Sequence, residues 1–295
     1  MKEEDITNPK IKLRMECEPL FKCATLNDSC ELIDIYSEFL FQAVKNHHHE
    51  PVYTKANADA KIILQMVMTK ALHLRSIVNG ITYKDRDGTT LNKIVDPTIV
   101  ASLIRNLYET VGLFNLIYRS TKTHDEKTIL YCLWFHSGLM YRQRFESAIT
   151  TQENQNKFDG DKKTLAELVQ IIEGTELFKQ LDEKNQTKIR TRLKQKEYLM
   201  MFDDKEVVFL HWHELTKVMK CNEGVLDEMY TYFSQYSHPS NVAVFQFANL
   251  FKKGEEEFLR MTNFNLKYFF FLTSIFIADL KVHIFVDGRA HAHNN

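Results

Sequence analysis

Glycine and proline are scarce in this chain. Only 9 glycines and 5 prolines occur among its 295 residues, whereas the two residue types together make up about 12% of an average protein. Neither a GxxxxGKS/T motif nor a GxGxxG motif is present. Because tight turns and phosphate-binding loops depend on these residues, their scarcity argues against a turn-rich all-β fold and against glycine-rich nucleotide sites.

The chain also lacks an excess of one charge and a long apolar run. Lys and Arg number 38 against 39 Asp and Glu, so no cationic excess is available to release counterions from nucleic acid. The most apolar stretch, Tyr268–Leu280, has only 13 residues and contains Asp279, whereas a bilayer-spanning helix needs about 20. We therefore expect a buried core helix at this stretch and no membrane role.

Cysteine usage and the first residues of the chain predict a compartment. The five cysteines include no CxxC pair, so a closed zinc site of the usual spacing is not indicated, and reduced thiols in a cytoplasmic protein are expected. The opening MKEEDITNPK contains no apolar signal-peptide core. Because neither HExxH nor ExxH occurs, no metal and no cofactor is assigned.

Apolar residues recur at helical spacing through most of the chain. The clearest helix start is Asp96 followed by Pro97, which suits an N-cap and a proline at the first helical position. The expected helices cover approximately 31–45, 56–80, 97–120, 126–145, 164–172, 175–183, 185–197, 213–221, 224–236, 239–252 and 255–285. Residues 83–93 are expected to be a loop, and 150–163 a domain boundary or a long surface loop. Residues 206–212 could form a short strand, but irregular structure is preferred.

These elements predict an all-α fold, a bundle of long antiparallel helices with a smaller helical lobe. Residues 1–150 and 222–295 form the expected main bundle. The more polar residues 151–221 form the expected lobe or insertion. A chain of this length allows one or two domains.

Arg105 and Glu109 are the first candidate site residues. They lie four residues apart in an otherwise apolar helix, so they share one helix face. A buried charge is costly unless it is paired. The two residues therefore either form an internal ion pair that fixes helix register or line a polar cleft in which Arg105 binds a phosphate or carboxylate.

The second candidate is the segment from Tyr230 to Asn241. Pro239 disfavours helical dihedrals at His238, so we expect a helix break at residues 237–238. Ser237 and His238 lie at this break, and Tyr230 lies about two turns upstream. His238 is a candidate general acid or base. The alternative is that Ser237 or His238 only caps the following helix.

Two further patterns suggest RNA. Arg119 and His124 have four residues between them, which resembles the R-x(4–6)-H signature of HEPN ribonucleases; that resemblance implies action on the RNA backbone within a homodimer. The alternative is a helix end followed by a loop. Lys184–Lys196 is the densest basic run and is either a nucleic-acid contact or a solvated helix face.

Two longer segments, Asp96–Phe114 (DPTIVASLIRNLYETVGLF) and Tyr232–Asn241 (YFSQYSHPSN), resemble an uncharacterised family of bacterial all-helical proteins. In that family a helix led by Asp-Pro carries an Arg and a Glu one turn apart, and a later helix ends in a Ser-His-Pro-Ser-like break. The family is distantly HEPN-like and abortive-infection-like. The resemblance implies a role in bacterial defence or RNA metabolism. Its matching residues are Arg105, Glu109, Ser237 and His238.

Two functions are therefore expected, and whether the chain is an enzyme stays open. The first is a cytoplasmic bacterial protein whose polar cleft binds or cleaves a phosphate-bearing ligand such as RNA. The candidate catalytic residues are His238, Arg105 and Glu109, and the candidate binding residues are Tyr230, Ser237, Arg119 and His124. The second is a non-catalytic module that binds a partner protein. In it the same residues are internal polar staples, that is, buried hydrogen bonds and ion pairs that hold one helix against another.

Overall fold

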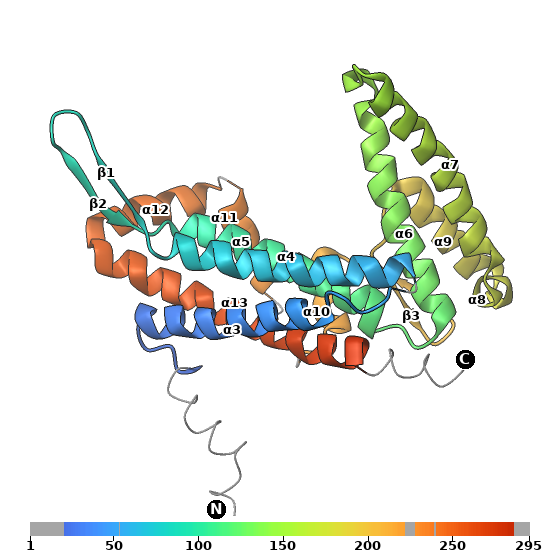
Figure 1. Cartoon of the computed structure of the whole chain (residues 1–295), viewed down its shortest axis with the longest axis horizontal. Coiled ribbons are helices and arrows are strands. Elements are labelled where there is room, and N and C mark those ends of the chain that lie inside the picture. The colour runs from blue at the N-terminus through green and yellow to red at the C-terminus, as the bar shows by residue number, and fades with distance from the viewer. Residues whose placement is uncertain (1–20, 53, 222–227, 239, 286–295) are drawn as a thin grey trace, which may run out of the picture. The chain divides into compact units, whose positions relative to one another are not determined.

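Helices make up most of the computed structural model, which describes residues 21–52, 54–221, 228–238 and 240–285 (Figure 1). The expected all-α class is confirmed. Within the described residues, β-structure is confined to two small antiparallel hairpins. Packing divides the chain into two units, with boundaries between Val111 and Gly112, between residues 221 and 228, and after Leu280. Residues 112–150 therefore pack with the polar segment 151–221.

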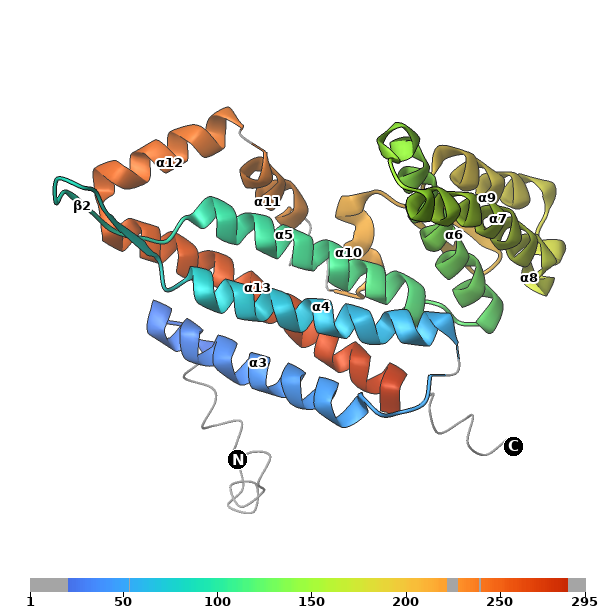
Figure 2. The same cartoon turned by 45° about the horizontal axis from the view of Figure 1, so that its top comes forward.

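The long helices of the first unit run side by side (Figures 1 and 2). Its elements are α3 (Leu26–His47), α4 (Lys55–Ile77), β1 (Ile81–Lys84), β2 (Thr90–Ile94), α5 (Pro97–Phe114) as far as Val111, α11 (Met229–Ser237), α12 (Asn241–Lys253) and α13 (Glu255–Phe285) as far as Leu280. The side chain of Ser29 on α3 donates to Asn263 on α13, and Tyr36 lies 2.5 Å from the hydroxyl of Ser274. These polar contacts fix α3 against α13.

The apolar stretch of α13 forms the core of this unit, as expected. Phe269, Leu272 and Phe276 are fully buried, and each buried side chain of this size contributes about 1.5–3 kcal/mol of hydrophobic free energy. Within the described residues, no helix combines the length and the apolar character needed to cross a bilayer.

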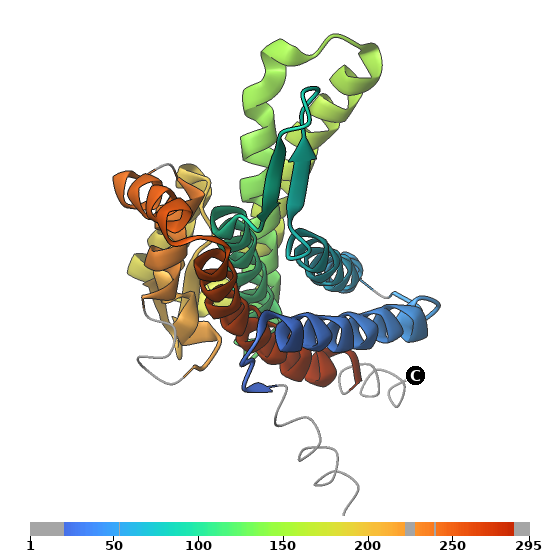
Figure 3. The same ribbon diagram turned by 90° about the vertical axis from the view of Figure 1, so that its left-hand side faces the viewer.

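The loop expected at residues 83–93 is wrong, because β1 and β2 form a hairpin there. Tyr83 pairs with Leu91, and the turn holds Gly88 at a φ of 89°. All four β1 side chains are exposed, and the hairpin extends beyond the helices of its unit (Figures 1 and 3). Its charged composition resembles a loop because neither face of the ribbon is buried, so the usual alternation of apolar and polar residues is weak.

The second unit contains the shorter helices and the other hairpin. Its elements after the end of α5 are η1 (Asn115–Arg119, a π-helical turn), α6 (His124–Arg142), η2 (Gln143–Ala148), α7 (Gln152–Gly174), α8 (Glu176–Gln180), α9 (Glu183–Gln195), β3 (Met200–Asp203), β4 (Glu206–Phe209), η3 (Trp212–Glu214) and α10 (Leu215–Val218). The irregular structure expected at 206–212 is wrong for Glu206–Phe209, which pairs with β3. Alternating burial in β3 shows that the hairpin packs one face inward.

The loop expected at residues 150–163 is also wrong, because α7 begins at Gln152 with Thr151 as its N-cap. Polar side chains one turn apart support the exposed face, as in the 2.6 Å ion pair between Glu153 and Lys157. Phe158 is buried on the opposite face. A polar composition therefore marks a solvated helix here rather than a break between domains.

Gly112 gives a test of packing in the second unit. A Cβ atom at this position would lie 2.6 Å from Cδ1 and 2.9 Å from Cβ of Leu215 on α10. We expect Gly112→Ala to lower the free energy of unfolding by about 1–2 kcal/mol, because overpacking costs about 1–3 kcal/mol and exceeds the gain in helix propensity.

Gly160→Ala in α7 is the matched control, because no neighbouring heavy atom lies within 4 Å of the position that the added methyl group would occupy. It should raise the free energy of unfolding by about 0.5–1 kcal/mol through helix propensity alone. Chemical denaturation of both variants measures the difference. Equal shifts in the same direction would contradict the close approach of α5 to α10.

Candidate functional site

Helix α5 presents Arg105 and Glu109 from a well-defined start. Asp96 accepts a 2.8 Å hydrogen bond from the backbone N–H of Thr98, which confirms the expected N-cap before Pro97. Nε of Arg105 donates to Oε1 of Glu109 across one turn at 3.2 Å. The side chains of Arg105 and Glu109 are 19% and 27% exposed, so the pair is half-buried at the edge of the apolar core.

Helix α11 ends where the sequence predicts. His238 has extended dihedrals, with φ −114° and ψ 145°, as expected for a residue before proline. The alternative that Ser237 or His238 caps the next helix is wrong, because Ser240 is the N-cap of α12 and accepts from the N–H of Ala243 at 3.1 Å. The hydroxyl of Ser237 donates to the carbonyl of Phe233 at 3.0 Å, so its proton is used within α11.

The Arg105 guanidinium joins these two elements. Nη2 donates to the Tyr230 hydroxyl at 2.8 Å, and Nη1 lies 3.2 Å from Nε2 of His238. The guanidinium carbon also lies 4.9 Å from the centre of the Tyr230 ring. Each guanidinium nitrogen therefore has one partner, and the candidate residues Arg105, Glu109, Tyr230 and His238 form one cluster. We call these four residues the Arg105 cluster.

The protonation state of His238 follows from its partner. A guanidinium carries only donors and stays protonated, so Nε2 of His238 must be the acceptor, and the imidazole is neutral with its proton on Nδ1. This tautomer is inferred from the hydrogen-bond geometry. His238 is exposed, whereas Tyr230 is half-buried. The cluster thus reaches solvent through His238.

The pKa of the Glu109 carboxyl lies above its ordinary value. Burial raises the pKa of the Glu109 carboxyl, and the charge and hydrogen bond of Arg105 only partly offset this effect. The loss of hydration therefore exceeds the attraction between the two charges. Tyr108, one turn from Arg105 on α5, packs its ring 5.7 Å from that of Tyr230. Sequence reasoning missed Tyr108, whose helical spacing identifies it only as a core residue.

Ser237 is not brought into the cluster by any described hydrogen bond. Arg119 and His124 lie in the second unit, where Arg119 ends η1 and His124 begins α6. The intervening residues are not helical, and Thr123 caps α6 by accepting from Glu126 at 3.1 Å. This agrees with the alternative of a helix end followed by a loop. It departs from the HEPN pattern, in which both residues lie on one helix.

Four of the six basic residues in the run Lys184–Lys196 are paired with carboxylates. Lys184 and Lys188 both contact Glu206, at 3.2 and 2.5 Å, and Arg190 pairs with Glu173 at 2.8 Å. Arg192 is paired with Glu197. These contacts support the solvated helix face rather than a nucleic-acid surface.

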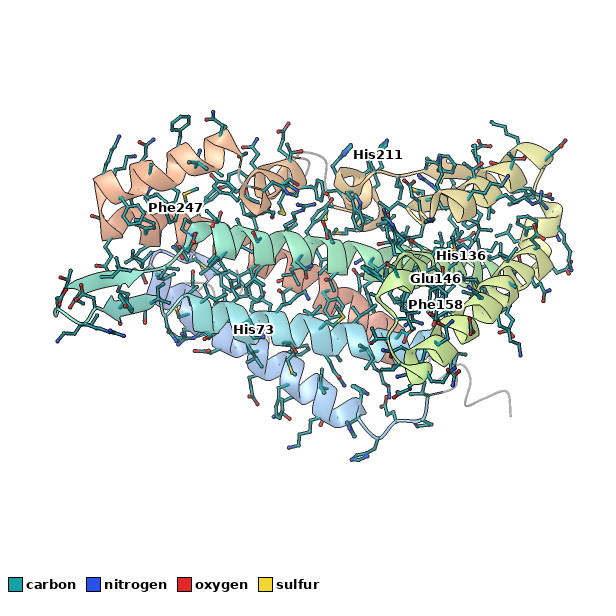
Figure 4. All side chains as sticks on the ribbon, turned by 90° about the horizontal axis from the view of Figure 1, so that it is seen from above. His73, His136, Glu146, Phe158, His211 and Phe247 are labelled. Atoms are coloured by element: carbon teal, nitrogen blue, oxygen red, sulfur yellow. The ribbon has the colours of Figure 1, made fainter. Side chains whose placement is uncertain are left out.

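The described residues contain no group of three or more His, Cys, Asp or Glu placed to hold a metal ion. His136 on α6 and His211 before η3 are well separated within the second unit (Figure 4). Of the cysteines, Cys23, Cys30, Cys132 and Cys221 are thiols outside any disulfide, and Cys17 lies outside the described residues.

Comparisons of the chain with protein-family models, with curated proteins and with solved structures find no match. The case for a site therefore depends on the Arg105 cluster itself.

The raised pKa of Glu109 predicts a pH-dependent stability with a definite sign. Because the folded protein holds the Glu109 proton more tightly than the unfolded chain, wild-type stability contributed by this group falls as pH rises above about 4, and then levels off beyond the folded pKa. Glu109→Gln removes this titration while keeping an amide oxygen to accept from Arg105. The unfolding free energy of the wild type minus that of the variant should therefore decrease between about pH 4 and 7.

Urea denaturation of both proteins across this pH range measures that difference. At pH 7 we expect the free energy of unfolding of the variant to be lower by less than the roughly 3–5 kcal/mol that follows loss of one partner from a fully buried pair. The carboxylate is only half-buried, and the neutral amide that replaces it costs less to remove from water. A difference that increases with pH would show that Arg105 dominates the titration and would contradict this account.

Proposed function

We propose that the Arg105 cluster binds a phosphate-bearing ligand, with RNA as the first candidate. Nη1 and Nη2 of Arg105 each carry two hydrogens, and one on each nitrogen is used by the contacts to His238 and Tyr230. Paired guanidinium donors match the oxygens of a phosphate. The cluster reaches solvent at His238, which is exposed.

The contact between Nη1 of Arg105 and Nε2 of His238 carries this proposal. It places a neutral imidazole beside a permanent cation where both can meet a ligand. An acid–base group next to a group that stabilises phosphate charge is also what cleavage of an RNA backbone requires. In that reaction His238 is the acid–base residue, and Glu109 is a positioning residue that holds Nε of Arg105.

A second function is favoured by a different observation. Three partners from α5, α11 and the turn after α11 converge on Arg105, which is also how an internal polar staple ties helices together. A staple belongs to a module that binds a partner protein through its surface and needs no phosphate ligand. The two functions differ in what Arg105 does for binding rather than for stability.

The test uses purified, metal-stripped protein and a fluorescent single-stranded RNA, with binding followed by anisotropy and cleavage followed on gels. Arg105→Gln should weaken binding at least about tenfold, because a hydrogen bond to a charged group contributes about 1.5–3 kcal/mol. Arg260→Gln is the matched control, because Arg260 lies in the same unit, is 71% exposed and pairs with Glu257. Thermal unfolding of each variant checks that the fold is retained.

RNA that fails to bind the wild type, or that binds Arg105→Gln equally well, would contradict the phosphate site and support the staple. Cleavage adds a second comparison. If RNA is cleaved, His238→Ala should abolish the reaction and His124→Ala should not. The reverse result would assign the chemistry to the HEPN-like pair Arg119 and His124 instead.

A further inference from the structure

We infer that His238 is a plug in the phosphate site, and that a phosphodiester displaces it with uptake of one proton by the imidazole. This inference rests on the proposed function and adds a mechanism of regulation to it. It starts from the observation that every guanidinium nitrogen of Arg105 already has a partner. Each Nη nitrogen keeps one further hydrogen, but a phosphate that reaches Arg105 through the exposed side of the cluster meets His238 first and replaces it on Nη1.

His238 is the partner that can leave. Glu109 is on the same helix as Arg105 and is only 27% exposed, and Tyr230 is half-buried with its ring against Tyr108. His238 is the exposed one of the three. Its backbone N–H donates to Ser234 at 3.3 Å, and its carbonyl accepts from Ser240 at 2.6 Å. The turn is held by these backbone bonds, so rotation of the side chain alone moves the ring.

The plugged and liganded states require different protonation states of His238. In the plugged state Nε2 must keep its lone pair, because a protonated ring would place a second cation against Arg105. In the liganded state an imidazolium beside the phosphate gains a charge-assisted hydrogen bond. Because the two states bind different numbers of protons, ligand binding and pH are linked.

The groups around His238 are consistent with this exchange. Arg105 on α5 contacts His238 directly, and Glu109 on α5 and Tyr230 on α11 are the titratable groups that contact Arg105. The first turn of α12 contributes no charged side chain. The negative end of α11 and the positive end of α12 meet at this turn, so the two helix dipoles oppose each other there. The exchange therefore takes place at Arg105, whose Nη1 contacts His238 in the plugged state and the phosphate in the liganded state.

The experiment measures binding of a 2′-O-methyl oligouridine without a terminal phosphate. This probe keeps the phosphodiesters, cannot be cleaved through a 2′-hydroxyl, and has no group that titrates between about pH 5.5 and 8, where histidine does. Because binding takes up a proton, wild-type affinity should fall by up to about tenfold per pH unit within this range. His238→Gln keeps an acceptor for Arg105 but no proton to gain, so its affinity should vary far less with pH.

His238→Ala gives a second signature, because it removes the plug together with the titrating group. It should bind the probe more tightly than the wild type near pH 8 and more weakly near pH 5.5. A residue that simply contacts the ligand would weaken binding at both pH values when removed. Calorimetry in two buffers of different ionisation enthalpy counts the proton taken up by the wild type and should find none for His238→Gln.

Equal pH dependence of the wild type and His238→Gln would overturn the plug and leave the phosphate site standing. An absence of a crossing between the wild type and His238→Ala would also overturn it. Failure of the wild type to bind the probe at any pH would overturn the proposed function together with the plug.

Discussion

The packing of α11 on α5 in the first unit depends on the hydrogen bonds that pair the half-buried guanidinium of Arg105. Arg105 lies on a helix on which Ile104, Leu107 and Tyr108 are fully buried. A charge at such a place is costly unless its donors are paired. The pairing comes from Glu109 one turn away, from Tyr230 on α11, and from His238 at the turn that follows. Because these groups lie on separate elements, satisfying one side chain fixes α5 against α11.

The cluster nevertheless has features that a purely structural contact does not need. A carboxylate whose pKa is raised by burial adds little net stability through its ion pair, and a well-packed apolar pair in its place is often equally stable or more so. His238 contributes little to the core because it is exposed. We base the proposed phosphate site on this arrangement, an arginine with donors left over beside an accessible imidazole.

Local chemistry made part of this arrangement predictable from the sequence. The four-residue spacing of Arg105 and Glu109 predicts their contact, and Pro239 predicts the extended backbone at His238. The contact between Arg105 and His238 joins residues 133 positions apart, and no local rule specifies it. It depends on how α11 packs on α5.

The errors in secondary structure have related causes. The first half of helix α7 is not predicted because its composition is polar. A solvated helix supported by i,i+4 pairs resembles a linker when only apolar periodicity is considered. The β1–β2 hairpin was hidden because none of the four β1 side chains is buried. The alternative of a cap at Ser237 or His238 is wrong by two or three residues, since Ser237 and Ser240 are both plausible caps by composition and only the observed contact of Ser240 decides between them.

The measurement that tests the central claim most directly is the tautomeric state of His238, observed through the imidazole nitrogen resonances of the free protein near neutral pH. A contact with Arg105 requires a proton on Nδ1 and a bare Nε2, the reverse of the tautomer that free histidine prefers. The account predicts this state in the unliganded protein, with both nitrogens protonated after oligouridine is added. A free protein whose His238 carries its proton on Nε2 would contradict the Arg105 contact and the site built on it.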